Sequence, residues 1–383
     1  MTTQYELLKD RFQYFSKHRS KEIFFDNDLN SHIILNFKTA VEFLKMPEMS
    51  SNRKKQQFSN LSTCPYSSKV LDFYSNWLMY MDGDIHKEYR QLAVKALSFS
   101  SKNLDNIVIN SFNKYIRPYI TTKQNNIEFV SNVLHPFTID ILSTIFGIDR
   151  DIYNKIILSS KPIVSFITNG EIGSLNERKK VLTSLELTQN ILDDCIKSCK
   201  SENSFIGYLL DNKISIEKIR PLLINILIDG YDPLISVINY YFYILAKKIH
   251  VPKDISNVGL FDELVRLEPS FQYCARVAKQ DVYINNYLIK KGERVTMFIS
   301  SANRDPSVFM DHKQIKIRMK KDKHISFGAG KHRCLGANIA QKVVTMLISS
   351  MKELETLGIK LIDENWINNV GFRAINKLYI KVE

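Results

Sequence analysis

Residues 326–340 read SFGAGKHRCLGANIA, with three glycines, one histidine and one cysteine between two apolar ends. Glycine loses more conformational freedom on folding than any other residue, so it is favoured where the backbone must turn sharply or a bulky group approaches it closely. Gly328, Gly330 and Gly336 therefore predict a tight loop around Cys334. The group that Cys334 binds is the first functional question that this sequence raises.

Three roles for Cys334 follow from the residues alone. A zinc site needs about four donors, and no second pair of cysteines or histidines lies nearby. A buried structural cysteine is the simplest role, but it needs no glycine-rich loop. The following stretch, LGANIAQKVVTMLISSMKEL, has helical spacing, so the sulfur lies near a helix N-terminus, which favours a thiolate. A nucleophilic cysteine would use the same effect, with His332 as a weak candidate for its base.

The composition indicates one large domain spanning residues 1–383, which can bury a core without disulfides. The chain has an odd number of cysteines without a CxxC pair: Cys64, Cys195, Cys199, Cys274 and Cys334. We therefore expect a reducing compartment. The first twenty residues contain no apolar run, so we expect a soluble, cytoplasmic monomer without a membrane anchor. The net charge of +13 comes without a nucleic-acid-binding motif.

Helical periodicity dominates between residues 80 and 250. Residues 126–148 place apolar side chains three and four positions apart, and residues 221–248 are apolar nearly all round, which predicts a buried central helix. Residues 281–300 alternate like two short strands around NN and KKG turns, and residues 375–382 predict another strand. The fold class is therefore mostly α with small β-sheets, an α+β protein.

The stretch FGAGKHRCLGANIA resembles the haem-binding loop of the cytochrome P-450 family, FGxGxHxCLGxxLA, with Ile339 in place of the usual leucine. The resemblance implies a haem b (iron protoporphyrin IX) between the long central helix and the helix that follows the loop. Cys334 would be the axial thiolate and metal ligand, which favours O–O cleavage. His332 would contact a haem propionate. Phe327, Gly328 and Gly336 would complete this side of the cofactor site.

Other motifs of the family follow in the expected order, and the resemblance spans roughly residues 75–375. FDELVRLEPS contains ExxR as Glu263 and Arg266, one helical turn apart, and Arg318 would complete a structural ion-pair trio. SANRDPSVF matches ANRDPxxF. Three further residues are expected to bind the haem propionates: His86 and Arg90 in MDGDIHKEYRQLAVKALS, which lacks the family's two prolines, and Arg276 in FQYCARVA.

The central helix departs from the family pattern, which reads AGxET or GGxDT. Here the segment is IDGYDPLIS, so Gly230 and Asp232 are in register but Pro233 replaces the threonine. In the family that threonine hydroxyl helps proton delivery during oxygen activation. Proline is also expected to open or kink the helix. Three explanations compete: the substrate supplies the missing group while Asp232 stays in the proton path, hydrogen peroxide is the oxidant, or haem is bound without monooxygenase turnover.

The resemblance implies an oxidoreductase, a monooxygenase or related tailoring enzyme of secondary metabolite biosynthesis that hydroxylates, desaturates or couples a small-molecule substrate. That substrate would be a small natural product, an amino acid or a carrier-bound intermediate; a peroxide-driven peroxygenase is the alternative. Expected pocket segments are residues 58–77, 165–175, 270–273 and 368–375, and the helix face with Ile226, Gly230 and Pro233. An acidic ferredoxin or a flavodoxin, with its reductase, would supply electrons beside Lys331, Arg333, Lys342, Lys87 and Lys95. The connection at residues 240–261 is short for the family, so a peripheral helix there is expected to be trimmed.

Overall fold

The computed structural model of the protein describes residues 2–53, 74, 76–123, 127–169, 175–199, 203–319, 323–354, 358–367 and 369–383. These residues form two compact units, each assembled from separate stretches of the chain. Unit 1 contains residues 1–55, 250–334 and 367–374. Unit 2 contains residues 56–249, 335–366 and 375–383. The single domain expected for residues 1–383 stays a prediction.

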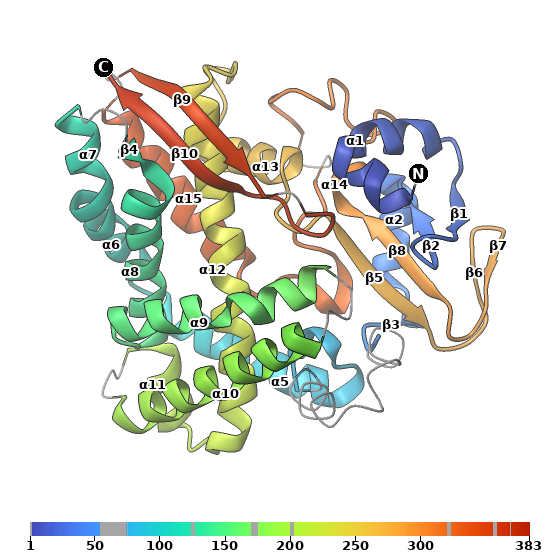
Figure 1. The fold of residues 1–383 in the computed structure, drawn as a ribbon, viewed down its shortest axis with the longest axis horizontal. Helices are drawn as coiled ribbons and strands as arrows, with labels where there is room; N and C mark the ends of the chain where they lie inside the picture. The colour runs from blue at the N-terminus through green and yellow to red at the C-terminus, as the bar shows by residue number, and fades with distance from the viewer. Residues whose placement is uncertain are drawn as a thin grey trace. The chain divides into compact units, whose positions relative to one another are not determined.

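Unit 1 is built on a five-stranded sheet (Figure 1) with the order β1 (Ile23–Asp26), β2 (Ser31–Ile34), β8 (Arg294–Phe298), β5 (Tyr273–Ala278) and β3 (Met49–Ser50). Strands β2 and β8 are parallel and the other pairs are antiparallel. Strands β6 (Val282–Ile284) and β7 (Tyr287–Ile289) form a separate hairpin. The helical elements of unit 1 are α1 (Thr3–His18), α2 (Phe37–Lys45), α13 (Asn257–Leu267), α14 (Ile299–Ala302) and the 3₁₀ turn η5 (Gly330–His332).

Residues 281–300 form three strands where the sequence predicted two. The NN turn closes the β6–β7 hairpin, with Asn285 at a φ of 54°, as expected for asparagine in a tight turn. The KKG turn, with Gly292 at a φ of 86°, then sends the chain into β8, which pairs with both β2 and β5. The apolar run RVTMF is therefore buried as an inner strand of the main sheet.

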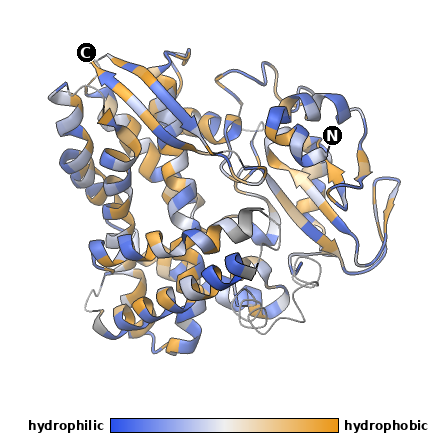
Figure 2. Ribbon diagram, in the orientation of Figure 1, coloured by the Kyte–Doolittle hydropathy of each residue, from blue (hydrophilic) through white to orange (hydrophobic). Residues whose placement is uncertain are grey.

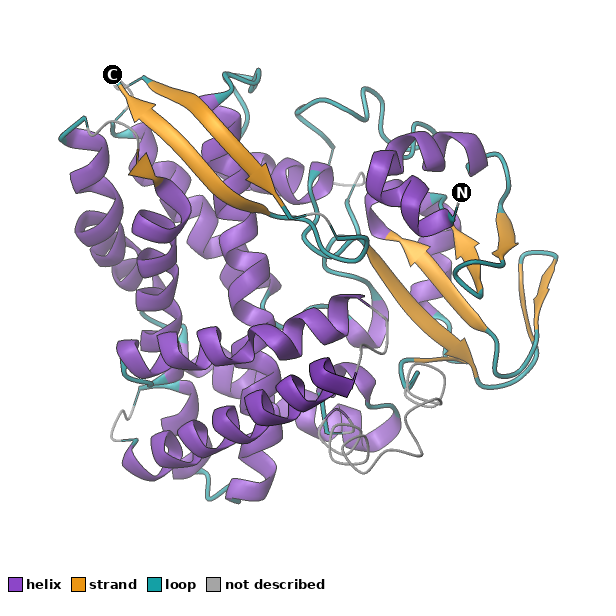
Figure 3. Ribbon diagram, in the orientation of Figure 1, coloured by secondary structure: helices purple, strands orange, loops and turns teal. Residues whose placement is uncertain are grey.

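Unit 2 is mainly helical (Figure 3). Its α-helices are α5 (Gly83–Ser100), α6 (Leu104–Ser111), α7 (Arg117–Thr121), α8 (His135–Phe146), α9 (Arg150–Asn169), α10 (Leu175–Ser198), α11 (Phe205–Asp211), α12 (Ile216–Ala246) and α15 (Ala337–Lys352). Short turns are η2 (Leu78–Tyr80), η3 (Phe112–Ile116) and η4 (Val130–Leu134). Strands β4 (Ile127–Glu128), β10 (Ile375–Val382) and β9 (Ile359–Trp366) form an antiparallel sheet in that order. Figure 2 shows hydrophilic and hydrophobic colours on both α9 and α10, as expected of helices with one buried face.

Helix α12 is the centre of unit 2, and it contacts α8, α9, α10, α15, β9 and β10. Within the described residues it is the one helix that is long and apolar enough to cross a membrane, and 67% of its most apolar window is buried. It runs as one helix through both Pro221 and Pro233, so the expected opening at Pro233 does not interrupt it. Proline removes one backbone hydrogen bond. Packing on several sides holds the helix together across that gap.

Other sequence predictions agree with the structure. The apolar stretch at residues 126–148 contains β4, η4 and α8, and residues 375–382 form β10. The stretch after Cys334 forms α15, with Gly336 as its N-cap residue. Between the end of α12 and the start of α13, residues 247–256 form neither helix nor strand, and the expectation that a peripheral helix of the family is trimmed there stays a prediction. The mostly α fold with small sheets is confirmed.

Candidate active site

The cysteine loop in unit 1 is closed by its own backbone. The Cys334 N–H donates to the Phe327 carbonyl at 2.8 Å, and the Gly328 N–H donates to the Ile325 carbonyl at 2.9 Å. Gly328 and Gly330 have φ values of 66° and 70°, in the region that favours glycine. A Cβ atom at Gly330 would lie 2.8 Å from the Leu44 carbonyl oxygen. The backbone conformation therefore requires glycine at both positions. Gly328 also leaves space beside the loop, because the nearest described atom to a Cβ there would be the His332 carbonyl oxygen at 3.8 Å.

Cys334 is exposed at the end of this loop. The Phe327 ring stacks on the Phe261 ring, with the two centroids 5.9 Å apart and the ring planes 19° apart. The centroid of the His324 ring lies 5.7 Å from that of Phe327. Among the described residues, no group of three His, Cys, Asp or Glu side chains gathers as a metal cluster. The arrangement offers a single sulfur ligand on an open side of the loop.

An ion-pair network holds the loop from behind. Arg266 of α13 binds Glu263 through two parallel hydrogen bonds of 2.6 and 2.9 Å, and Arg318 donates to the same carboxylate at 2.8 Å. Glu263 and Arg266 are 3% and 1% exposed. Because an unpaired charge in the interior is strongly destabilising, the Glu263 carboxylate and its arginine partners are stable there only while they are paired. The trio predicted from the sequence is therefore confirmed.

The same network reaches the start of the cysteine loop through Asn303, which the sequence analysis missed. The Arg266 guanidinium donates to the Asn303 carbonyl at 3.0 Å. The Asn303 amide donates to Ser326 Oγ at 2.8 Å and accepts from the Ile325 N–H at 2.9 Å. Asn303 lies in the ANRDP motif, so its position in that motif was the available signal. The ion pairs and the loop thus form one connected structure.

The three residues expected to bind the haem propionates lie in two elements, β5 and α5. Arg276 is buried on β5, where its Nη1 atom donates to the Cys274 sulfur at 2.9 Å and to the Ala275 carbonyl at 2.9 Å. His86 and Arg90 lie one turn apart on α5, the first buried and the second half-buried. Helix α5 begins after Asp82 with Gly83 at a φ of 70°, where the family has prolines. The roles of these residues in haem binding stay predictions, as does the propionate contact of His332.

On α12, the segment that departs from the family pattern is half-buried. A Cβ atom at Gly230 would meet no other heavy atom within 4 Å, so the helix surface is open there. Burial raises the pKa of Asp232 to about 6, and the positive charge of Lys161 opposes part of that rise. An acid with such a pKa exchanges protons readily near neutral pH. The catalytic roles of Gly230, Asp232 and Pro233 stay predictions.

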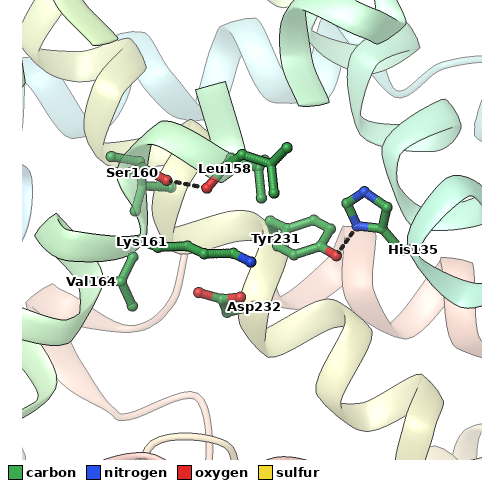
Figure 4. Close-up of a pocket in the computed structure, with 9 residues that line it drawn as sticks. His135, Leu158, Ser160, Lys161, Val164, Tyr231 and Asp232 are labelled. Atoms are coloured by element: carbon green, nitrogen blue, oxygen red, sulfur yellow. Dashed lines mark hydrogen bonds between the residues drawn. The ribbon is translucent and has the colours of Figure 1, made fainter. Parts of the chain in front are cut away.

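Asp232 also lines a cavity of about 70 Å³ between α8, α9 and α12. Figure 4 shows His135 and Tyr231 pointing toward one another and Lys161 extending toward Asp232. The Tyr231 hydroxyl donates a hydrogen bond to His135 Nδ1, and His135 Nε2–H donates to Asn154 Oδ1 at 2.8 Å. Burial lowers the pKa of His135, which favours the neutral ring. The contact between His135 and Tyr231 was not predicted, because the two residues are distant in the chain and share no motif.

Two of the expected pocket segments lie together in unit 1. The Gln272 N–H donates to the Gly371 carbonyl at 2.9 Å, and the Arg373 N–H donates to the Ser270 carbonyl at 2.8 Å. The Phe271 and Phe372 rings meet edge to face at 5.5 Å. Most of residues 58–77 and the end of 165–175 lie outside the described residues.

Known proteins were compared with the whole chain. The family model described as Cytochrome P-450 matches residues 260–355. The polyketide biosynthesis cytochrome P-450 PksS of Bacillus subtilis is 22% identical over 367 residues, which cover 91% of this chain and 88% of that protein. The crystal structure of P450BioI in complex with an acyl carrier protein ligated to hexadec-9Z-enoic acid has a TM-score of 0.84 and 20% identity, covering both chains completely.

Residues 260–355 match the cytochrome P-450 family, and the whole chain has the cytochrome P-450 fold. A further relative, the biotin biosynthesis cytochrome P-450 of Bacillus subtilis, is 28% identical over 180 residues, and this match spans 45% of each chain. These matches indicate an oxidoreductase of the monooxygenase type. Family membership implies a haem-thiolate cofactor, a substrate and a redox partner.

The cysteine loop of this cytochrome P-450 fits that cofactor. It presents one exposed sulfur on a backbone kept open by Gly328, and α15 begins three residues after Cys334. A thiolate there is stabilised by the helix N-terminus.

Proposed function

We propose that this cytochrome P-450 is a haem-thiolate monooxygenase that tailors a small natural product, with haem b as its cofactor. The observation that carries the proposal is the exposed Cys334 on its closed, glycine-bearing loop. The haem supplies dioxygen activation when it is bound. In the reaction, substrate, dioxygen, NADPH and one proton give hydroxylated substrate, water and NADP⁺. One oxygen atom enters the substrate, and the other leaves as water.

The residues of the chain have separate tasks in this proposal. Cys334 is the axial ligand, and the Glu263 network keeps its loop in place. His86, Arg90, Arg276 and His332 neutralise the haem propionates, since arginine and histidine donors match carboxylate acceptors. Asp232 exchanges protons with the cavity beside Lys161, as its raised pKa favours.

The proposed substrate class is a carrier-bound acyl chain or a comparable small metabolite. Two observations support it. The relatives include proteins named for biotin and polyketide biosynthesis. A structure with the same fold contains an acyl carrier protein ligated to a fatty acid. Both are properties of those proteins, so direct measurement on this chain is needed.

The test supplies fatty acids, free and bound to acyl carrier protein, with NADPH, a ferredoxin and its reductase under isotopically labelled dioxygen. We expect one labelled oxygen atom in the product from carrier-bound substrate. Hydrogen peroxide alone is the control for the peroxygenase alternative, which Pro233 motivates. A peroxide-driven rate far above the NADPH-driven rate would favour the peroxygenase, and unlabelled product would contradict monooxygenation.

Reduction of the enzyme by an acidic ferredoxin should slow as salt rises. Lys331 and Arg333 are exposed on either side of His332 in the cysteine loop and carry positive charge. Exposed charges are screened beyond about 10 Å at 0.1 M ionic strength, so electrostatic steering weakens with salt. Stopped-flow reduction from low to high salt measures the effect. Lys342 makes a weaker contribution, because it already pairs with Asp105 at 3.0 Å. A rate independent of salt would contradict this docking site.

A further inference from the structure

The cavity between α8, α9 and α12 has the features of a ligand site of its own. All the residues that line it belong to unit 2. Its volume is about 70 Å³. A single water needs about 10–15 Å³, so the cavity has room for several waters or for one small organic ion. The polar side chains of the lining are those of His135, Ser160, Lys161, Tyr231 and Asp232.

Three of these polar side chains already have partners within the fold. The Tyr231 hydroxyl donates to His135 Nδ1, and His135 Nε2–H donates to Asn154 Oδ1 at 2.8 Å. The Ser160 hydroxyl donates to the Ile157 carbonyl at 3.0 Å. These donors are all engaged, so they form polar walls rather than ligand contacts. A ligand in the cavity would therefore be bound by the other two side chains.

Lys161 and Asp232 are these two side chains. Figure 4 shows Lys161 extending from α9 toward Asp232 of α12. In the described part of the chain, neither side chain forms a hydrogen bond or an ion pair. Lys161 is exposed at the mouth of the cavity, and Asp232 is half-buried. A cation that solvent can reach and a more deeply placed acid thus face the same small space.

The protonation state of Asp232 decides what this space can bind. Burial raises the pKa of Asp232 to about 6, and the charge of Lys161 opposes part of that rise. Above this pKa, the Asp232 carboxylate neutralises the charge of Lys161 and repels an anion. Below it, the neutral acid offers an O–H donor and the ammonium of Lys161 attracts an anion. The titratable groups around Asp232 are His135 on α8, Tyr153 and Lys161 on α9, and Asp229 and Tyr231 on α12.

A short-chain carboxylate has the chemistry that matches these groups. Its oxygens can accept one hydrogen bond from the Lys161 ammonium and another from protonated Asp232. Its alkyl group can pack against the apolar part of the lining, which includes the buried side chains of Ile157 and Ile228. The volume of the cavity restricts the ligand to a few non-hydrogen atoms, as in acetate or propionate.

We propose that this cavity is a binding site for a short-chain carboxylate, held between Lys161 and Asp232. The inference goes beyond the proposed function, because every residue of the site lies in unit 2 and the site needs no haem. Binding is non-covalent and is coupled to the uptake of one proton by Asp232. The affinity for the carboxylate therefore rises as the pH falls.

The test is a calorimetric titration of the full chain with acetate near pH 5.5 and near pH 7.5. Acetamide, which has the same shape without the charge, is the control ligand. We expect the affinity for acetate to be at least about tenfold lower near pH 7.5, since the protonated fraction of an acid falls about tenfold with each pH unit above its pKa. Near pH 5.5, acetamide should bind much more weakly than acetate, because it accepts no charge-assisted hydrogen bond from a carboxylate oxygen.

Four variants locate the ligand and the proton. Lys161→Gln removes the ammonium and should weaken acetate binding near pH 5.5 by about tenfold or more. Lys155→Gln, at an exposed lysine of α9 that does not line the cavity, is the matched control and should bind acetate like the wild type. Asp232→Asn keeps an N–H donor at every pH, so it should bind acetate equally well at both pH values. Asp229→Asn should keep the pH dependence of the wild type, because Asp229 does not line the cavity.

A wild-type protein that binds no acetate near pH 5.5 would overturn the inference, because the cavity would then hold water only. Equal affinities for acetate and acetamide would overturn it as well, since the charge of Lys161 would not select the ligand. Unchanged binding in Lys161→Gln would place the ligand elsewhere, and a pH dependence that persists in Asp232→Asn would show that Asp232 is not the group that takes up the proton. The titrations do not measure turnover, so a failure of the proposed monooxygenase function would leave their outcome unchanged.

Discussion

Replacing Cys334 by serine should abolish NADPH-driven turnover, the largest effect that we expect from any single substitution. A serine hydroxyl does not supply the electron density of a thiolate, which favours O–O cleavage in this family. The loop itself should persist, because Cys334 contributes its backbone N–H to the hydrogen bond with Phe327. The measurements are turnover, haem content and the electron paramagnetic resonance signal of the ferric enzyme.

Cys199→Ser is the control for the Cys334 substitution. Cys199 lies half-buried just after α10 and makes one weak contact with the Gly147 carbonyl at 3.7 Å. We expect wild-type spectra and turnover from this variant. A Cys334→Ser enzyme that keeps the thiolate signal and its turnover would show that another residue is the ligand.

Glu263→Gln should destabilise unit 1 and reduce haem binding. The substitution leaves the buried Arg266 and the nearly buried Arg318 without the carboxylate that both contact. Removing one partner from a buried ion pair costs about 3–5 kcal/mol, because the remaining charge is uncompensated. The loss should also loosen the cysteine loop, which Arg266 reaches through Asn303. Denaturant unfolding and haem content per chain measure the two effects.

The matched control for Glu263 is Glu6→Gln. Glu6 pairs with Lys17 at 3.7 Å on the surface of α1, and exposed pairs contribute about 0–1 kcal/mol. We expect little change in its unfolding midpoint. If Glu263→Gln changed the unfolding midpoint and the haem content as little as Glu6→Gln does, the ion-pair network would not stabilise the cysteine loop.

The sequence predicted the parts of the site that depend on local pattern. Gly328 and Gly330 have positive φ values, as a tight loop requires, and the ExxR spacing placed Glu263 and Arg266 on one helix face. The apolar run at residues 221–248 identified α12. In these cases, the residues that interact lie within a few positions of each other, so their spacing in the sequence predicts how they are placed in the structure.

The remainder of the site depends on contacts between distant segments. Tyr231 meets His135 of α8, and Asn225 meets the backbone of Leu78, yet neither pair has a characteristic spacing. Helix α12 continues through Pro233, where the sequence predicted an opening or a kink, because the packing around a helix is not visible in its own sequence.

The absorption spectrum of the reduced wild-type enzyme under carbon monoxide tests most directly whether Cys334 holds a haem as a thiolate. We expect the long-wavelength Soret band that is characteristic of thiolate-ligated haem, and its loss in Cys334→Ser. A wild-type enzyme that binds no haem, or whose carbon monoxide complex absorbs only at the shorter wavelength of histidine-ligated haem, would contradict the assignment of Cys334 and the proposed monooxygenase function.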